Sequence, residues 1–181
     1  HAGEMSSKMA GLRLPMIPTD SLPSDSLPSG EDLLALERQC RRSGSGITMA
    51  SLIGTWRLRA TWSRDGTPAP AASAALLRGL GACLILSGEE TDGALRIANQ
   101  VNLGSLRLRF DGEAELTGRR PLLMFSFRSV RLSLGTLTLF ERGLPQPDAR
   151  RMPFFALIGL DREQGRLSAR GRGGGLALWM R

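Results

Sequence analysis

Few side chains in this sequence are of the kinds that most often perform catalysis or bind metals. His1 is the only histidine among the 181 residues, and the two cysteines, Cys40 and Cys83, stand at no spacing that metal ligands use. Catalysis by a Ser–His or Cys–His pair requires a histidine that the fold can position, and His1 belongs to a segment expected to be mobile. The sequence therefore predicts no catalytic residue, no metal, no cofactor and no enzyme activity. Two cysteines also make no disulfide framework, which favours a reducing compartment.

Arginine is the residue type with the clearest chemical potential. The chain carries a formal net charge of +7, and of its 24 basic residues only Lys8 is a lysine. The planar guanidinium presents a fork of donors that matches phosphate, sulfate or carboxylate. A basic surface of this kind fits nucleic acid, anionic lipid head groups or an acidic partner. An arginine-rich genome composition explains the same excess, and the sequence leaves both explanations open.

A glycine-rich segment at 171–175 invites comparison with phosphate-binding loops. Arg172 lies within it, but no Gly-Lys-Ser/Thr follows and the next residues alternate like a strand. The segment is therefore predicted to be a hairpin turn. Gly54-x-Trp56 is the second motif: glycine permits close backbone packing, and a broad tryptophan can plug the closed end of a barrel.

The N-terminal part of the chain is predicted to be a tail followed by one helix. Residues 1–29 contain four prolines and a near-duplicated Ser-Leu-Pro-Ser sequence, so they are expected to be a disordered tail or linker. A helix is predicted over 30–43, because Ser29 is a suitable N-cap and apolar residues recur at helical spacing from Leu33 to Cys40.

From Leu52 onward the apolar period changes to two, as in a strand with one buried face. In 56–62 the apolar residues alternate with Arg, Arg and Thr, and 106–110 repeats the pattern. A short helix is expected within 70–80. Many short strands with hairpin-length gaps predict an all-β domain over 30–181, an antiparallel barrel with an N-terminal helix. Further candidate strands lie at 83–86, 95–102, 113–116, 122–128, 130–134, 136–140, 154–160, 166–170 and 176–179.

The apolar residues on one side of these strands are expected to line the barrel interior. An eight-stranded barrel is either filled by such side chains or holds one small ligand, so each is packed core or ligand contact. The predicted lining also includes Leu106 and Leu137. The candidate ligand-binding residues are Trp56, Leu58, Trp62, Leu108, Phe110, Phe125, Phe127, Leu139, Phe155, Leu157, Arg170 and Arg172.

Three segments together resemble the plastid lipid-associated protein family, also called PAP/fibrillin, in its cyanobacterial and chloroplast form. Residues 52–58 (LIGTWRL) are similar to the family's opening G-x-W strand, 99–139 contain NQVNLG, LRL and SLGTLTL, and 169–179 read ARGRGGGLALW. The resemblance covers roughly residues 31–181 in the family's order and spacing. The closing motif departs at Arg172, where many plastid members have an acidic residue.

This resemblance implies a lipocalin-like fold, association with a lipid or isoprenoid, and peripheral attachment to a thylakoid or plastoglobule-like surface on the cytoplasmic side. In lipocalin-like barrels the tryptophan at the closed end is commonly covered by an arginine of the last strand. Arg170 and Arg172 are the candidates for a cation–π contact with Trp56. This contact is either structural or part of the ligand site.

The leading functional hypothesis is a non-catalytic protein that binds or sequesters a lipid, quinone or carotenoid-like molecule at or near photosynthetic membranes. Exterior arginines would hold it at an anionic membrane surface. The alternative is a lipocalin-like lyase that attaches bilin chromophores to antenna proteins, with arginine pairing the propionates. Nucleic acid is not an expected partner, because base stacking needs exposed aromatics and those here fall on the predicted inner face. The sequence makes no prediction of oligomeric state.

Overall fold

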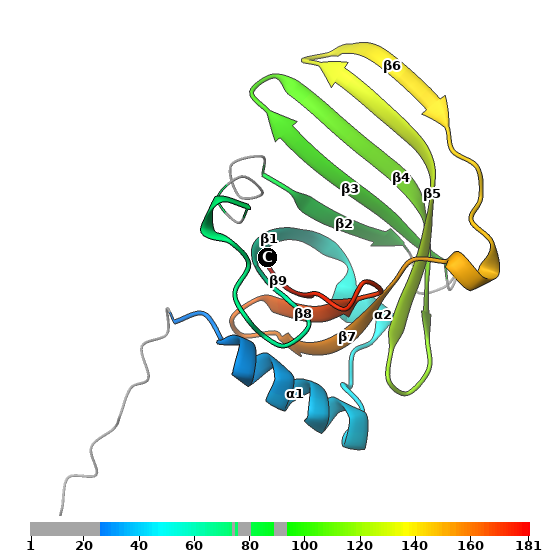
Figure 1. Ribbon diagram of the computed structural model, residues 1–181. Helices are drawn as coiled ribbons and strands as arrows, with labels where there is room; N and C mark the ends of the chain where they lie inside the picture. The colour runs from blue at the N-terminus through cyan, green and yellow to red at the C-terminus, as the bar shows by residue number, and fades with distance from the viewer. Residues whose placement is uncertain (1–25, 74, 76–80, 89–93) are drawn as a thin grey trace, which may run out of the picture.

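Nine antiparallel strands form one continuous sheet in the computed structural model, which describes residues 26–73, 75, 81–88 and 94–181 (Figure 1). The strands form where apolar and polar residues alternate, because successive side chains of a strand point to opposite faces of the sheet. They are β1 (Gly54–Trp62), β2 (Cys83–Gly88), β3 (Leu95–Leu103), β4 (Leu106–Thr117), β5 (Leu122–Leu134), β6 (Leu137–Gly143), β7 (Phe154–Asp161), β8 (Arg166–Gly171) and β9 (Leu176–Met180).

Eight of these strands close into a barrel. The order is β4-β3-β2-β1-β9-β8-β7-β5-β6, and an additional β4–β5 pairing closes the ring and leaves β6 outside it. β5 changes partner along its length: its first residues pair with β7 and its last residues pair with β6. The predicted all-β antiparallel barrel, of lipocalin-like form, is confirmed.

Helix α1 (Gly30–Ser43) lies against the outside of the barrel, below it in Figure 1, at the position predicted from the sequence. Ser29 caps it, since its hydroxyl accepts from the Asp32 N–H at 3.1 Å while the Asp32 carboxylate accepts from the Ser29 N–H at 2.8 Å. A single turn, α2 (Met49–Leu52), precedes β1, and a 3₁₀ turn, η1 (Ala149–Arg151), precedes β7. Among the described residues, no helix is long and apolar enough to cross a membrane.

A bulge in β1 turns one predicted interior residue, Trp62, to the outside. The pairing of β1 with β9 shifts by one residue between Leu58 and Ala60. Side chains after the bulge therefore point to the opposite face from the one that strict alternation predicts. The predicted interior position of Trp62 is wrong: it is 7% exposed and packs with Leu33 of α1 and Leu176 of β9, in the layer between helix and barrel.

The barrel interior holds the main hydrophobic core. Its fully buried members come from strands on all sides of the ring, among them Trp56, Leu86, Leu123 and Leu167, each at most 1% exposed. Leu52 of α2, at 0% exposure, joins the same core and covers one end of the barrel. Toward the blade, Phe110 and Phe127 on the inner face are only partly buried, so that end is the one through which a ligand could reach the interior.

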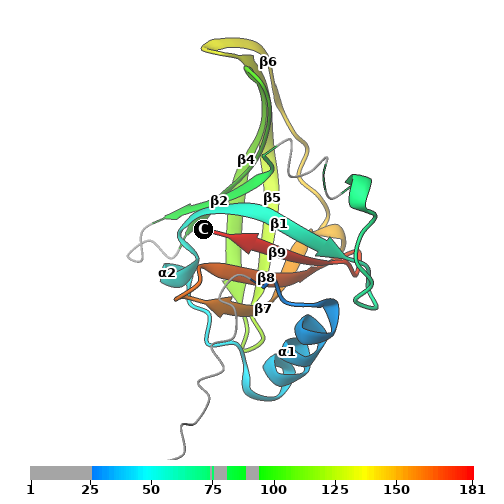
Figure 2. The ribbon, with the colours of Figure 1, turned by 90° about the vertical axis from the view of Figure 1, so that its left-hand side faces the viewer.

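The upper parts of β3, β4 and β5, together with β6, extend beyond the barrel as a curved sheet, here called the blade (residues 101–110 and 130–143). Figure 2 shows the blade edge on, projecting above the ring. Leu139 belongs to the blade, where the β5–β6 register shifts opposite Leu132 and Ser133. The predicted place of Leu139 in the barrel lining is therefore wrong; it is 49% exposed on a strand outside the ring. Most of the helix predicted within 70–80 lies outside the described residues, as does most of the predicted tail 1–29.

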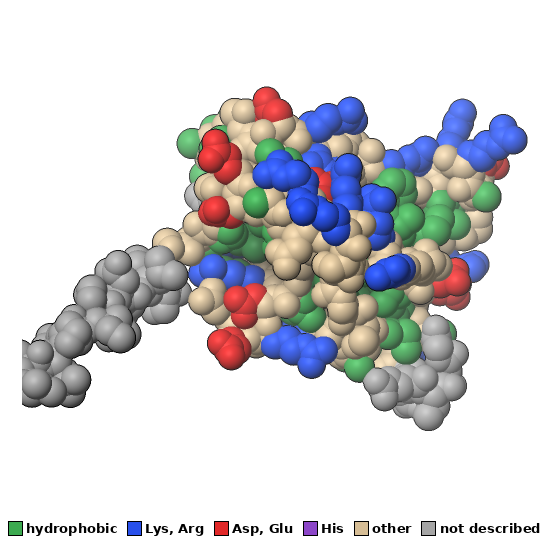
Figure 3. All heavy atoms as spheres, turned by 90° about the horizontal axis from the view of Figure 1, so that it is seen from below, with side chains coloured by type: hydrophobic (Ala, Val, Ile, Leu, Met, Phe, Trp, Pro, Cys, Tyr) green, Lys and Arg blue, Asp and Glu red, His purple; other side chains and the backbone are tan. Residues whose placement is uncertain are grey.

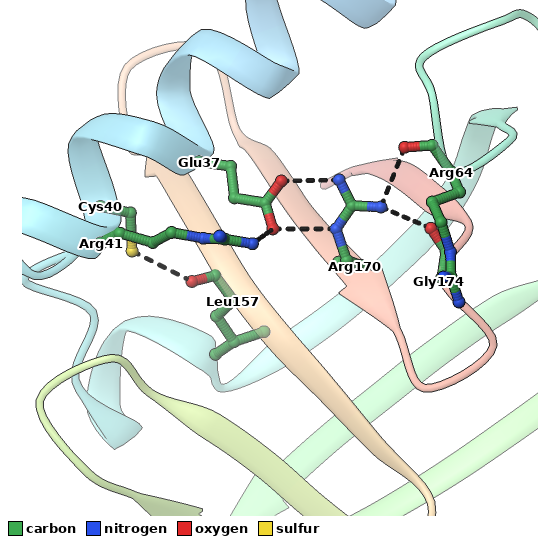
Figure 4. A network of polar contacts seen from close by, with 7 residues as sticks. All are labelled: Glu37, Cys40, Arg41, Arg64, Leu157, Arg170 and Gly174. Carbon is green, nitrogen blue, oxygen red and sulfur yellow. Dashed lines mark hydrogen bonds and ion pairs between the residues drawn. The ribbon is translucent and has the colours of Figure 1, made fainter.

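A bidentate ion pair ties α1 to the barrel (Figure 4). Arg170 of β8 donates from Nε to Glu37 Oε1 at 2.8 Å and from Nη2 to Oε2 at 2.6 Å. The two side chains are only 18% and 12% exposed. Arg170 Nη1 donates to the carbonyls of Gly174 at 2.6 Å and Arg64 at 3.2 Å, and Arg41 also donates to Glu37, at 3.0 Å. Arg170 thus holds the helix and the glycine-rich turn on the exterior, not in the predicted cavity.

We expect Glu37→Gln to lower the free energy of unfolding by about 2 kcal/mol at neutral pH, because it removes a charge-assisted pair and leaves Arg170 without its anion. The hydrogen bond from Arg170 holds the pKa of Glu37 below its ordinary 4.5, against the opposing effect of burial. Stability from a lowered carboxyl pKa is present above the unfolded-state pKa and is lost as the pH falls through the folded-state pKa. The difference between wild type and variant in urea unfolding should therefore shrink below pH 4.5.

The matched control is Glu141→Gln. Glu141 pairs with Arg131 at 2.9 Å, but both side chains are about half exposed. An exposed pair of this kind contributes little to stability, so Glu141→Gln should lose much less than Glu37→Gln. Equal losses for the two variants at neutral pH, or a loss for Glu37→Gln that persists in acid, would contradict the assigned role of the Glu37–Arg170 pair.

Candidate ligand-binding site

A continuous row of aromatic rings runs from the blade to the barrel core. The ring centroids of Phe110 and Phe127 lie 5.5 Å apart, those of Phe127 and Phe125 5.4 Å, those of Phe125 and Phe155 5.1 Å, and those of Phe155 and Trp179 5.2 Å. These spacings are typical of attractive aromatic contacts. The row joins β4, β5, β7 and β9 across the inner face of the sheet.

Burial varies along this row, and the two rings nearest the blade are only partly buried. Trp179 and Phe125 are 7% and 9% exposed, whereas Phe110, Phe127 and Phe155 are only partly buried. Covering a partly exposed aromatic surface with an apolar molecule removes that surface from water, which favours binding. The partly exposed rings are therefore the best candidate for a ligand contact surface.

The strand register shows which residues of the described strands face the barrel interior. All of these interior residues are uncharged. Two of them are polar: Thr61 pairs with Ala177 of the main core, and Asn99 pairs with Phe110 of the aromatic row. Pockets for small molecules are mostly apolar, with a few polar groups that fix the orientation of the ligand. Thr61 is partly buried and Asn99 is exposed, so either could hydrogen-bond a neutral hydroxyl or carbonyl group of a ligand that reaches it.

The opposite end of the barrel is closed by Trp56 and an arginine. The Trp56 indole donates from Nε1 to the carbonyl of Leu52 at 2.8 Å. The guanidinium carbon of Arg181 lies 4.4 Å from the ring centroid of Trp56, a cation–π contact. Arg181 also donates from Nη2 to the carbonyls of Ser51 at 3.2 Å and Ile53 at 2.9 Å. This closure holds α2, β1 and β9 together.

Gly54 makes the closure possible. Its φ of +144° is one that side-chain-bearing residues rarely adopt, and a Cβ there would lie 3.3 Å from the Arg181 guanidinium nitrogens. The G-x-W motif therefore combines a glycine that admits the arginine with a tryptophan that the arginine covers. The expected cation–π contact exists, but its arginine is Arg181, not Arg170 or Arg172. Arg172 is exposed and donates to the carbonyl of Arg150 at 2.8 Å.

The structure brings most of the predicted lining residues to one face. Leu108 shares that face but lies on the blade, beyond the ring, and is paired with Val101 and Leu132. Leu106 and Leu137 share it too, at the far end of the blade. Those inside the barrel or at its mouth are Trp56, Leu58, Phe110, Phe125, Phe127, Phe155 and Leu157.

Sequence reasoning missed two residues of the site, Trp179 and Arg181. Every residue of β9 is apolar, so its sequence gives no sign that Trp179 faces inward while Leu178 faces α1. Only the pairing of β1 with β9, in which Trp179 lies opposite Leu58, reveals this orientation.

Neither cysteine has the environment of a nucleophile. Cys40 lies on α1 and is buried at 7% exposure against the barrel, with its thiol 3.5 Å from the carbonyl oxygen of Leu157. Burial raises the pKa of both the Cys40 and Cys83 thiols, and a reactive thiol needs a lowered pKa. Within the described ranges, no three His, Cys, Asp or Glu side chains are grouped so that they could hold a metal ion.

Two hollows lie outside the barrel, beneath α1. One has a volume of about 470 Å³ and is bordered by Leu36, Cys40 and Arg166. The other has about 380 Å³, with Arg41 and Arg120 at its edge. Figure 3 shows basic side chains gathered on this face of the molecule, which is the face of α1 and of the hairpin between β4 and β5. This face is far from the mouth of the barrel.

A scan against protein-family models finds no match to this chain, and a search of the curated proteins finds no relative.

We expect Arg181→Ala to lower the free energy of unfolding by about 1–2 kcal/mol, through loss of the cation–π contact and of two hydrogen bonds. Acrylamide should also quench Trp56 more efficiently, because the guanidinium no longer covers its ring. Arg172→Ala is the matched control and should change neither quantity, since Arg172 is exposed and its recorded hydrogen bond goes to a backbone carbonyl away from Trp56. Unchanged quenching in Arg181→Ala would show that Arg181 does not close this end of the barrel.

Proposed function

We propose that this protein is a non-catalytic carrier that binds a hydrophobic small molecule at the open end of its barrel. The observation that carries the proposal is the aromatic row, in which Phe110 and Phe127 at the blade end, and Phe155 nearer the core, are partly exposed on the inner face of the sheet. Side chains of the protein do not fully cover these rings, so part of each ring is free to contact an apolar ligand.

The lining favours a neutral ligand. Its assigned positions within the barrel are apolar except for Thr61 and Asn99, so affinity would come from apolar burial of about 25 cal/mol per Å². A lipid, quinone or carotenoid-like molecule suits this lining. A bilin suits it less well, because its propionates need cations and Arg170 is already paired with Glu37 outside the barrel.

The proposed place of action is a membrane surface. The resemblance of the G-x-W strand and of the ARGRGGGLALW ending to the plastid lipid-associated family supports a photosynthetic membrane, with the protein attached from the cytoplasmic side. The net charge of +7 supports attraction to anionic lipids.

The test is a fluorescence titration in a Trp62→Phe background. Trp62 lies outside the barrel, so its removal leaves Trp56 and Trp179 as the reporters of the interior. Decylubiquinone, oleate and retinol, added without vesicles, represent a quinone, a fatty acid and an isoprenoid. We expect saturable quenching or a blue shift with at least one of them. A flat titration across all three would contradict the proposal.

The titration is then repeated with Phe127→Ser, which we expect to weaken binding about tenfold because a phenyl ring is lost from the contact surface. Leu36→Ser is the matched control: it makes a similar apolar-to-polar change at a site on α1 that is 37% exposed. Urea unfolding establishes that both variants fold. Equal affinities for the two variants would place the ligand somewhere other than the aromatic row.

A further inference from the structure

The inner face of the blade carries two complete rows of apolar side chains, here called the leucine platform. Residues paired across antiparallel strands lie on the same face, so the strand register defines each row. The outermost row is Leu103, Leu106, Leu134 and Leu137. The second row is Val101, Leu108, Leu132 and Phe140.

These side chains are unusually exposed for their type. Leu103 and Leu137 are 66% and 62% exposed, and Leu134 and Phe140 are 48% and 49% exposed. Scattered exposed leucines are ordinary on a protein surface, but a contiguous patch marks an interaction site. The platform is therefore a candidate interaction surface.

Charges begin where the platform ends. The third row of the same face is Asn99, Phe110, Val130 and Arg142, so the first cation on this face follows the two apolar rows. On the opposite face Arg107 stands one residue behind the outermost row, and its Nε donates to Asn102 Oδ1 at 3.2 Å. Both arginines are exposed, and no carboxylate pairs with either within the described part of the chain.

The two turns at the tip of the blade are uncharged. The β3–β4 turn is Gly104 and Ser105, and the β5–β6 turn is Gly135 and Thr136. The end of the blade is thus apolar and free of charge, with arginines a short distance behind it on both faces. This arrangement matches the layers of an anionic bilayer, in which hydrocarbon lies beneath a shell of phosphates.

We propose that the tip of the blade inserts into an anionic lipid bilayer, with the leucine platform against the acyl chains and with Arg107 and Arg142 at the level of the phosphates. The inference rests on the proposed function, because the bilayer is then the source of the carried molecule. Phe110 lies in the row next to the platform and contacts Phe127. The platform and the aromatic row therefore form one apolar path from the bilayer to the barrel.

The size of the platform favours a bilayer over a second copy of the chain. Four strands about 4.8 Å apart and two rows about 7 Å apart cover roughly 250 Å². A stable protein interface buries about 800 Å² on each partner. A bilayer requires no shape complementarity, so a small apolar surface with flanking cations is sufficient for reversible attachment.

The test is flotation of the full chain with vesicles of phosphatidylcholine alone and of phosphatidylcholine with one third phosphatidylglycerol. We expect stronger binding to the anionic vesicles. The double variant Leu103→Ser/Leu137→Ser should reduce binding to them by at least about tenfold. Arg107→Gln/Arg142→Gln should remove the preference for phosphatidylglycerol. Light scattering without vesicles measures the oligomeric state of each protein.

The matched control is Arg38→Gln/Arg42→Gln, which removes the same charge from exposed positions on α1, far from the blade. It should bind anionic vesicles like the wild type. The inference is overturned if the wild type does not bind the vesicles or if the leucine variant binds them as well as the wild type does. An equal loss of binding in both arginine variants would also overturn it. So would a wild-type dimer that the leucine variant abolishes. The ligand titration without vesicles tests the proposed function separately, since both leucines lie outside the barrel.

Discussion

The unequal length of the strands is the constraint on which the rest of this structure depends. β4 and β5 have 12 and 13 residues, whereas β2 and β8 have six and β9 has five. The short strands are long enough to close a ring with only part of the β4–β5 hairpin. β5 resolves the mismatch by pairing first with β7 and then with β6. The lower half of the long hairpin becomes barrel wall, and its upper half stands free with β6 as the blade.

One sheet face therefore serves in two environments. Within the ring, the inner sides of β4 and β5 contribute Ala114, Leu123 and Phe125 to a buried core. Beyond the ring, the same alternation continues and presents apolar side chains that no closing strand covers. The aromatic row crosses the boundary between the two parts. The two proposals, ligand entry at the open end and attachment through the blade, thus rest on one geometric mismatch between long and short strands.

The sequence predicted the features that depend on local pattern. The capped helix and the antiparallel barrel follow from Ser29 with its apolar helical face and from the period of two after Leu52. The orientation of Trp62 did not follow, because a one-residue bulge near Arg59 reverses every side chain beyond it and leaves no mark in the alternation. The sequence also could not predict two long-range contacts, because each joins residues more than a hundred positions apart. These are the contact of Arg181 with Trp56 and the ion pair of Arg170 with Glu37.

The outer edge of β6 has a further consequence. β6 is the last strand in the sheet order, so one side of its backbone faces away from every strand of the described sheet. Unpaired backbone groups beside an apolar face are a template for strand-to-strand aggregation. The irregularity at Leu139 interrupts the straight run of this edge, and Glu141 and Arg142 place opposite charges along it. The blade thus combines an exposed apolar face with an outer edge whose bulge and charges disfavour edge-to-edge pairing of regular strands.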